Sequence, residues 1–329
     1  MIADPGRFLV KKRQWWDVMK YARLHTGECY RTPAIYHCVA RDAWLHVPSG
    51  FVVDSQKRVL GFSSVGLNCL YTGHAASGWE NAPWIEAPAW SIATAWGTNY
   101  AHWLMDSLPR AVMMADFPAA LVSGMQAGPF QLRGLEMMGA PAPMTPGAEL
   151  LRFRELHFLS CGPSGVPHPE ALRQVRERLL AAAGAEDQPA SLRIYLSREK
   201  TRRRIVNGDE ITEILRDWGF QEVFAEELDF AAQVRLFSQA SAVFGAHGAG
   251  TMNGLFQPAG SVLIEAFNPA VWDHAAHRVA SLCGVRHFHL FGENASRAFD
   301  MLICPRKLEK TLALALEPDT HPSLPEKIF

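Results

Sequence analysis

Apolar positions along the chain follow two patterns, which together predict alternating strands and helices. Short apolar runs such as residues 192–196 predict buried strands, and residues 169–182 have the spacing of an amphipathic helix. This alternation begins near residue 99 and predicts an α/β fold with parallel sheets covered by helices. The expected helices are 99–114 (interrupted near Pro109), 130–138, 169–182, 209–218, 230–240, 251–256, 274–283 and 307–316, and the expected strands are 120–122, 156–159, 192–196, 222–224, 242–244, 260–265 and 287–290.

The length of the chain, 329 residues, favours two domains. Residues 183–189 are the best linker candidate, so we expect an N-terminal domain over residues 1–187 and a C-terminal domain over residues 188–329. Two α/β halves would leave a cleft between them, a usual place for a ligand. Residues 1–90 are harder to interpret and are expected to be partly β, with a hairpin at residues 51–60.

Composition narrows the class of protein. With 48% hydrophobic residues and a formal net charge of −1, the chain does not look like a nucleic-acid binder. It has no apolar run of the roughly 18 residues that cross a bilayer and no signal-peptide pattern, so we expect a cytoplasmic protein. Residues 11–16 mix cations with two tryptophans, which would allow peripheral contact with the inner membrane. A solvated helix or strand with one packed face is the plainer interpretation.

A glycine-rich turn is the most informative motif. Strand 242–244 runs into three glycines within residues 245–250, and a short helical pattern follows. Because N–H groups at a helix start are unpaired and carry partial positive charge, and glycine allows close approach, this arrangement suits a phosphate. His247 adds a side-chain donor, and Glu265 at the end of the next strand could accept hydrogen bonds from ribose hydroxyls. The segment therefore predicts a nucleotide site.

A cationic cluster follows strand 192–196. Residues 198–204 hold five cations, among them Arg198, Lys200 and Arg204. Ligands of open parallel sheets gather beyond the carboxyl ends of strands, where arginine offers paired donors and lysine a point charge to a pyrophosphate. Taken alone the cluster fits a solvated loop equally well, but the glycine-rich turn in the same half favours a phosphate role.

A third cluster lies on the helix that begins near residue 99. His102 and Asp106 are four residues apart and share a helix face, and Arg110 continues the stripe. A carboxylate beside an imidazole fixes its tautomer and raises its basicity, which suits a general base. The alternative is a buried hydrogen-bonded pair that anchors the helix.

The remaining histidines include pairs with metal-ligand spacing, His274 with His277 and His287 with His289. No third ligand is evident beyond Asp273, and no Asp-x-Asp signature is present. The six scattered cysteines contain no CxxC pair. We therefore expect neither a metal site nor a required cofactor.

The three clusters, in this order, resemble the motifs of glycosyltransferase family 61, which includes bacterial capsular-polysaccharide enzymes. The matching segments are 99–110, 195–207 and 245–250, and the resemblance covers about residues 91–315. Ala101 departs from it, since many relatives carry an aromatic residue there. The resemblance implies a GT-B fold, two Rossmann-like domains facing across a cleft, and inverting transfer from a UDP-linked sugar to a glycan or glycolipid in capsular or extracellular polysaccharide synthesis.

The resemblance also implies roles for residues. It places the diphosphate of the donor at the glycine-rich turn, the ribose at Glu265, and the acceptor near His102 or Asp106 as base. The implied donor-binding residues are Arg198, Lys200, Arg204, His247, Gly248, Ala249, Gly250, Thr251 and Glu265, and the implied acceptor-side residues are Asn99, Trp103 and Arg110.

Two other functions fit parts of the pattern. The glycines, followed by Glu265, imitate the fingerprint of an NAD(P)-dependent oxidoreductase, but their spacing is GxxGxG rather than GxGxxG. A non-catalytic nucleotide- or glycan-binding protein that keeps the fold is the second alternative.

Overall fold

The computed structural model describes residues 7–9, 29–32, 34–64, 78–162, 166–185 and 189–317. The chain forms two compact units, one of residues 31–182 and one of residues 183–329 together with strand β1 (Arg7–Leu9). The expected boundary between residues 187 and 188 and the segment 11–16 lie outside the described residues. Within the described ranges, no helix combines the length and the apolar character that a membrane span requires.

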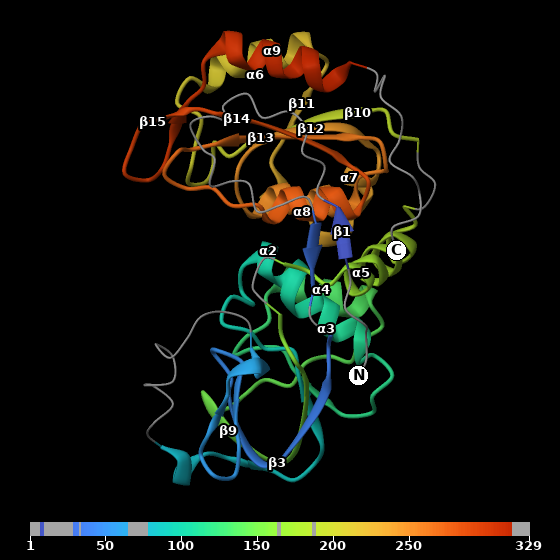
Figure 1. Ribbon diagram of the computed structural model, residues 1–329, viewed down its shortest axis with the longest axis vertical. Coiled ribbons are helices and arrows are strands. Elements are labelled where there is room, and N and C mark those ends of the chain that lie inside the picture. The colour runs from blue at the N-terminus through green and yellow to red at the C-terminus, as the bar shows by residue number, and fades with distance from the viewer. Residues whose placement is uncertain are drawn as a thin grey trace. The chain divides into compact units, whose positions relative to one another are not determined.

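The second unit alternates strands and helices, as the sequence pattern predicts. Its sheet strands are β10 (Leu192–Leu196), β11 (Gln221–Val223), β12 (Ala240–Ala246), β13 (Val262–Phe267) and β14 (Arg286–Phe291), and its helices are α6 (Gly208–Asp217), α7 (Phe230–Ser238), α8 (Ala275–Leu282) and α9 (Pro305–Leu316). Every residue of β13 is buried, the pattern of a strand covered on both faces. Figure 1 shows α6 and α9 on one face of this sheet and α7 and α8 on the other.

All neighbouring strands in this sheet run parallel, in the order β11-β10-β12-β13-β14. From β10 the chain moves to β11 on one side, whereas β12, β13 and β14 follow on the other side. The order therefore reverses between β10 and β12, which is where open α/β sheets bind their ligands, beyond the carboxyl ends of the strands. The two strands are in register there, with Leu196 opposite Gly245.

The expected helix over 251–256 differs in type and length. It is a 3₁₀ segment, η7 (Ala249–Phe256), that begins two residues earlier, directly after Gly248. The other expected elements of the second unit are confirmed to within a few residues at their ends.

The first unit contains a mixed sheet of β3 (His37–His46), β4 (Phe51–Val53), β5 (Val59–Leu60), β6 (Trp84–Ile85), β7 (Ala89–Ser91), β8 (Ala120–Val122) and β9 (Leu150–Leu159). The strand order is β5-β4-β3-β9-β7-β8, with β6 paired to β9. Strands β6 to β9 pair in parallel, and β3, β4 and β5 add antiparallel pairs. The expected hairpin at residues 51–60 is confirmed, with Val53 opposite Val59. The parallel strands are compatible with a Rossmann-like glycosyltransferase fold.

Strand β9 is longer than the sequence pattern predicts, because it begins at Leu150 rather than at residue 156. Within β9, Leu151 and Phe153 are buried, whereas Arg154 is exposed. When apolar and charged residues alternate along a strand, one face of the strand is buried and the other meets water. A search for continuous apolar runs does not detect such a strand.

The helix expected over 99–114 is confirmed as a continuous stretch of three parts, α2 (Tyr100–His102), a π-helical segment η5 (Trp103–Ser107) and α3 (Leu108–Met113). Pro109 has no N–H, and in a regular α-helix its ring would collide with the carbonyl of Met105. The wider π turn, closed by the Leu108 N–H to the Trp103 carbonyl, accommodates the proline. The interruption therefore lies just before Pro109.

The remaining elements are two helices and several short segments. Helices α4 (Pro129–Met137) and α5 (Pro169–Ala183) confirm two expected helices. Short elements are β2 (Cys29–Arg31), which pairs with β1, the 3₁₀ turns η2 (Gly61–Ser63), η4 (Trp79–Asn81) and η6 (Ala225–Glu227), and the strand pair β15 (Glu293–Asn294) and β16 (Met301–Leu302).

Candidate active site

The glycine-rich turn and one cation of the 198–204 cluster meet where the strand order reverses. A Cβ on Gly248 would lie 2.3 Å from Nη1 of Arg198, so only a residue without a side chain leaves the guanidinium its present place. Arg198 Nε donates to the Arg202 carbonyl at 2.9 Å, which fixes the head group. Burial, and then the like charge of Arg203, lower the pKa of Arg198, yet an arginine stays cationic at neutral pH.

Main-chain donors lie beside this cation. The first hydrogen bond of η7 runs from the Thr251 N–H to the Gly248 carbonyl at 3.1 Å. The N–H groups of Ala249 and Gly250 precede this bond, at the end of the segment that carries partial positive charge. Gly248, Ala249 and Gly250 are all partly exposed. Guanidinium and amides together form a site suited to a phosphate.

His247 lies between two carboxylates beneath the turn. Its Nδ1 is 3.1 Å from Glu265 Oε1, and its Nε2 is 3.4 Å from Asp273 Oδ2. Burial alone would lower the pKa of His247, but the hydrogen bonds to Asp273 and Glu265 outweigh it and raise the pKa to about 9. His247 is therefore an imidazolium at neutral pH and adds a fixed positive charge to the site.

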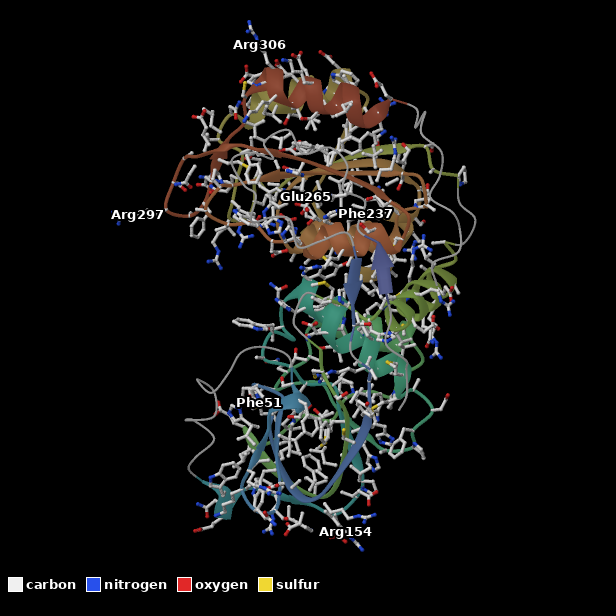
Figure 2. All side chains as sticks on the ribbon, in the orientation of Figure 1. Phe51, Arg154, Phe237, Glu265, Arg297 and Arg306 are labelled. Atoms are coloured by element: carbon white, nitrogen blue, oxygen red, sulfur yellow. The ribbon has the colours of Figure 1, made fainter. Side chains whose placement is uncertain are left out.

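Glu265 is completely buried, and Figure 2 shows it in the interior of the second unit, in contrast to Arg306 on the surface. Oε1 accepts from Thr251 Oγ1 at 2.7 Å in addition to His247, and Oε2 is 2.8 Å from His287 Nε2. Burial would raise the pKa of Glu265, but the hydrogen bonds from both histidines hold it far below its usual range. The carboxylate holds the turn in place and presents no oxygen to a ribose in this conformation.

The other histidines of the second unit surround this carboxylate. His277 stacks on His287 with 4.9 Å between ring centroids. Burial lowers the pKa of His289 to about 3 and that of His274 to about 4, so both are neutral at physiological pH. Among the described residues, no group of three or more histidine, cysteine or acidic side chains is arranged to hold a metal ion.

The 198–204 cluster divides in the structure. Lys200 forms an ion pair with Glu227 and lies over the Phe224 ring, 4.0 Å from its centroid. The Arg204 N–H donates to Asp300 Oδ1 at 2.8 Å, and its guanidinium is 3.9 Å from the same carboxylate. These two cations are held by acids elsewhere in the unit.

Arg203, which the sequence argument did not single out, lies at the turn. Its Nη1 donates to the His247 carbonyl at 3.4 Å, and its backbone adopts the left-handed conformation, with φ at 64°. Five neighbouring cations look alike in sequence, so only the fold separates Arg198 and Arg203 from the rest.

In the first unit the expected pair is formed, since His102 Nδ1 is 2.8 Å from Asp106 Oδ2. The His102 side chain is 26% exposed and stacks on Trp96, with 5.9 Å between ring centroids. Asn99 caps the helix, since its side chain accepts from the N–H groups of Ala101 and His102. Trp103 is completely buried and contributes to the core. Within the His102–Asp106 pair the imidazole is the more exposed member, and Asn99 and Trp96 beside it are exposed as well.

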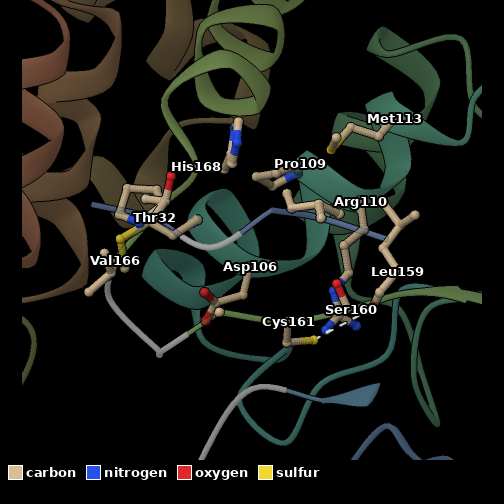
Figure 3. A pocket seen from close by; sticks show the side chains of 14 residues that line it. Thr32, Asp106, Pro109, Arg110, Met113, Leu159, Ser160, Cys161, Val166 and His168 are labelled. Carbon is tan, nitrogen blue, oxygen red and sulfur yellow. Dashed lines mark hydrogen bonds between the residues drawn. The ribbon is translucent and has the colours of Figure 1, made fainter. Parts of the chain in front are cut away.

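Arg110 lines a cavity of ≈ 60 Å³ beside the same helix, where Figure 3 shows it with Asp106 and His168. Its guanidinium is buried and donates to the carbonyls of Ala93 at 3.2 Å and Ser63 at 3.4 Å. Burial lowers the pKa of Arg110 to about 10, against the opposing charge of Asp106. A cavity of this volume has room for a few water molecules but not for a sugar ring.

The second unit combines a parallel α/β sheet, compatible with a Rossmann-like glycosyltransferase fold, with a glycine-rich turn at the carboxyl ends of β10 and β12. A sequence model of the family Glycosyltransferase 61 matches residues 100–264, half of the chain. The chain belongs to glycosyltransferase family 61, and it therefore uses a sugar donor and an acceptor. A comparison with curated proteins finds no match. Membership of this family favours glycosyl transfer over hydride transfer and therefore argues against the oxidoreductase alternative.

Proposed function

We propose that the protein transfers a sugar from a UDP-linked donor to a hydroxyl of a glycan or glycolipid, with inversion at the anomeric carbon. One observation carries the donor half of this proposal. The Arg198 guanidinium and the Gly248 turn meet at the carboxyl ends of β10 and β12, where the strand order reverses.

In this proposal the donor diphosphate lies on the N–H groups of Ala249 and Gly250 and against Arg198, with His247 adding positive charge beneath them. Negative charge grows on the diphosphate as the bond to the anomeric carbon breaks. Donors that are already fixed stabilise that charge without reorganisation, which is the largest contribution in many enzymes. Thr251 and Glu265 hold the turn through the bond from the Thr251 hydroxyl to the Glu265 carboxylate.

His102 acts as the base in this proposal. Because Nδ1 is bonded to the Asp106 carboxylate, the neutral imidazole carries its lone pair on Nε2. The acceptor oxygen forms its bond to the anomeric carbon while the bond from that carbon to the diphosphate breaks. The hydroxyl proton passes to Nε2, and the electron pair of the broken bond leaves with the diphosphate. Asp106, the more buried of the two, positions the ring.

The proposal extends to the GT-B arrangement, to transfer without a metal ion, and to polysaccharide synthesis at the cytoplasmic side of the inner membrane, with peripheral contact through residues 11–16. The parallel five-stranded sheet supports a Rossmann-like donor domain. Arg198 and His247 supply positive charge of the kind that a metal ion provides in other sites.

The test compares two arginines of one loop, Arg198→Ala and Arg202→Ala. Arg202 has an exposed side chain, and only its carbonyl contacts Arg198. We expect Arg198→Ala to lower kcat/KM about 100-fold, because loss of one donor to a developing anion typically costs about 3 kcal/mol. Arg202→Ala should stay within about threefold of the wild type in a coupled assay of UDP release. Equal activity of both variants would exclude Arg198 from the donor site.

A further inference from the structure

Asp273 is the acid that the fold brings to the rim of the phosphate turn. It follows β13, the strand beside the glycine-rich strand β12, in the loop that leads into α8. Its Oδ2 lies 3.4 Å from His247 Nε2, and its side chain is 61% exposed. Glu265, eight residues earlier, has both carboxylate oxygens engaged inside the protein.

The loop that carries Asp273 is fixed at both ends. At its start, the buried Asn268 donates to the carbonyls of Phe299 and Asp300 at 3.0 and 3.1 Å, and its own Oδ1 accepts from the Ala270 N–H. At its end, Asp273 Oδ1 accepts from the Ala275 N–H at 2.7 Å, in a turn that leads into α8. One carboxylate oxygen is therefore committed to the helix, and the other is held in place at the site.

The remaining oxygen has capacity for another partner. A charge-assisted hydrogen bond is usually about 2.7–2.9 Å long, so the 3.4 Å contact of Oδ2 with His247 is loose. A carboxylate repels phosphate. The bond between Asp273 and the Ala275 N–H prevents the carboxylate from moving away from the turn when a diphosphate binds there. An acid fixed beside a diphosphate therefore suits a neutral donor group that flanks the phosphates.

We propose that Asp273 accepts a hydrogen bond from a hydroxyl group of the bound donor, next to its diphosphate. In a nucleotide sugar, hydroxyls flank the diphosphate on two sides, on the ribose and on the transferred sugar. Asp273 thus selects a nucleotide sugar over inorganic pyrophosphate. This inference rests on the proposed function, since it requires a diphosphate at the Gly248 turn.

Calorimetry on the full chain tests it with pyrophosphate, UDP, 2′,3′-dideoxy-UDP and UDP-glucose. The variant is Asp273→Asn, which keeps an oxygen for the Ala275 N–H and removes the charge. The control is Asp229→Asn, because the Asp229 side chain likewise accepts from a backbone N–H at the start of a helix, that of Ala232 at 2.7 Å. We expect Asp273→Asn to weaken UDP binding about tenfold, to bind UDP and the dideoxy analogue equally, and to bind pyrophosphate at least as tightly as the wild type. Asp229→Asn should resemble the wild type with all four ligands.

The ligands separate the outcomes. If Asp273→Asn weakens the binding of UDP, the hydroxyl belongs to the ribose. If the variant weakens the binding of UDP-glucose but not of UDP, the hydroxyl belongs to the transferred sugar. Both results support the inference. Unchanged or tighter binding of both by Asp273→Asn overturns the inference while leaving the donor site intact. A wild-type protein that binds none of the four ligands would overturn the proposed function itself.

Discussion

Two histidines, one in each unit, are held by carboxylates in different ways. His247 lies between two acids and has an 8% exposed side chain, whereas His102 contacts one acid and is 26% exposed. The two carboxylates together outweigh burial, raise the pKa of His247 and keep its imidazole charged. A permanently charged ring suits the stabilisation of a phosphate. A partly exposed ring with a single orienting acid suits the acceptance and release of a proton.

The largest effect should follow from His102→Ala. If His102 is the base, turnover should fall about 10²- to 10⁴-fold, the usual contribution of general base catalysis, while UDP affinity stays within about twofold. Asp106→Asn keeps the shape of the pair and should lower kcat strongly, because the ring loses the acid that fixes its tautomer. Rapid-quench assays with saturating donor measure kcat, and calorimetry measures UDP affinity.

Two results would contradict the role proposed for His102 and Asp106. If both variants retain normal kcat, the base lies elsewhere, and the His102–Asp106 bond serves only to anchor the helix. If UDP affinity falls along with kcat, the two histidines act on the same ligand, and the division of roles between them fails.

The second effect concerns stability. Glu265→Ala leaves the buried His247 and His287 without their shared acid, and removal of one partner from a buried ionic network typically costs about 3–5 kcal/mol. Urea denaturation measures the change in free energy of unfolding. Glu309→Ala, on the exposed side of α9, provides the control and should stay within about 0.5 kcal/mol of the wild type. A small change at Glu265 would mean that the turn is held by its backbone alone.

The segments proposed to bind substrates could be located from sequence because each of them is local. The glycines, the cations after β10 and the i,i+4 spacing of His102 and Asp106 can all be identified within short segments. The structure brings Arg198 and Gly248 together because parallel strands in register end at the same edge. Local pattern and sheet topology were therefore sufficient to predict that Arg198 and Gly248 meet.

The rest depends on contacts between residues far apart in the chain. Lys200 is held by Glu227, and Arg204 by Asp300, so two of the three predicted cations have partners that spacing does not reveal. The sequence pattern predicts Glu265 at the end of a strand, but β13 continues to Phe267. Its carboxylate is engaged by Thr251, His247 and His287. The position of Asp273 beside His247 follows from the path of a seven-residue connection, Asn268 to His274, which no periodic pattern describes.

The smallest effect is a pH dependence that isolates the charge of His247. The pKa of His247 is raised by the fold from 6.5 to about 9, so its contribution to stability is present in full below pH 6.5 and is lost as the pH rises through about 9. His247→Gln keeps a hydrogen-bond donor but has no titratable group. The difference in free energy of unfolding between wild type and variant should therefore be largest near pH 6 and shrink up to about pH 9.5, because other titrating groups cancel between the two proteins. Urea denaturation at about six pH values measures this difference. A difference that is constant over the range would mean that His247 is neutral in the folded protein, in which case Arg198 and Arg203 supply the positive charge at the turn.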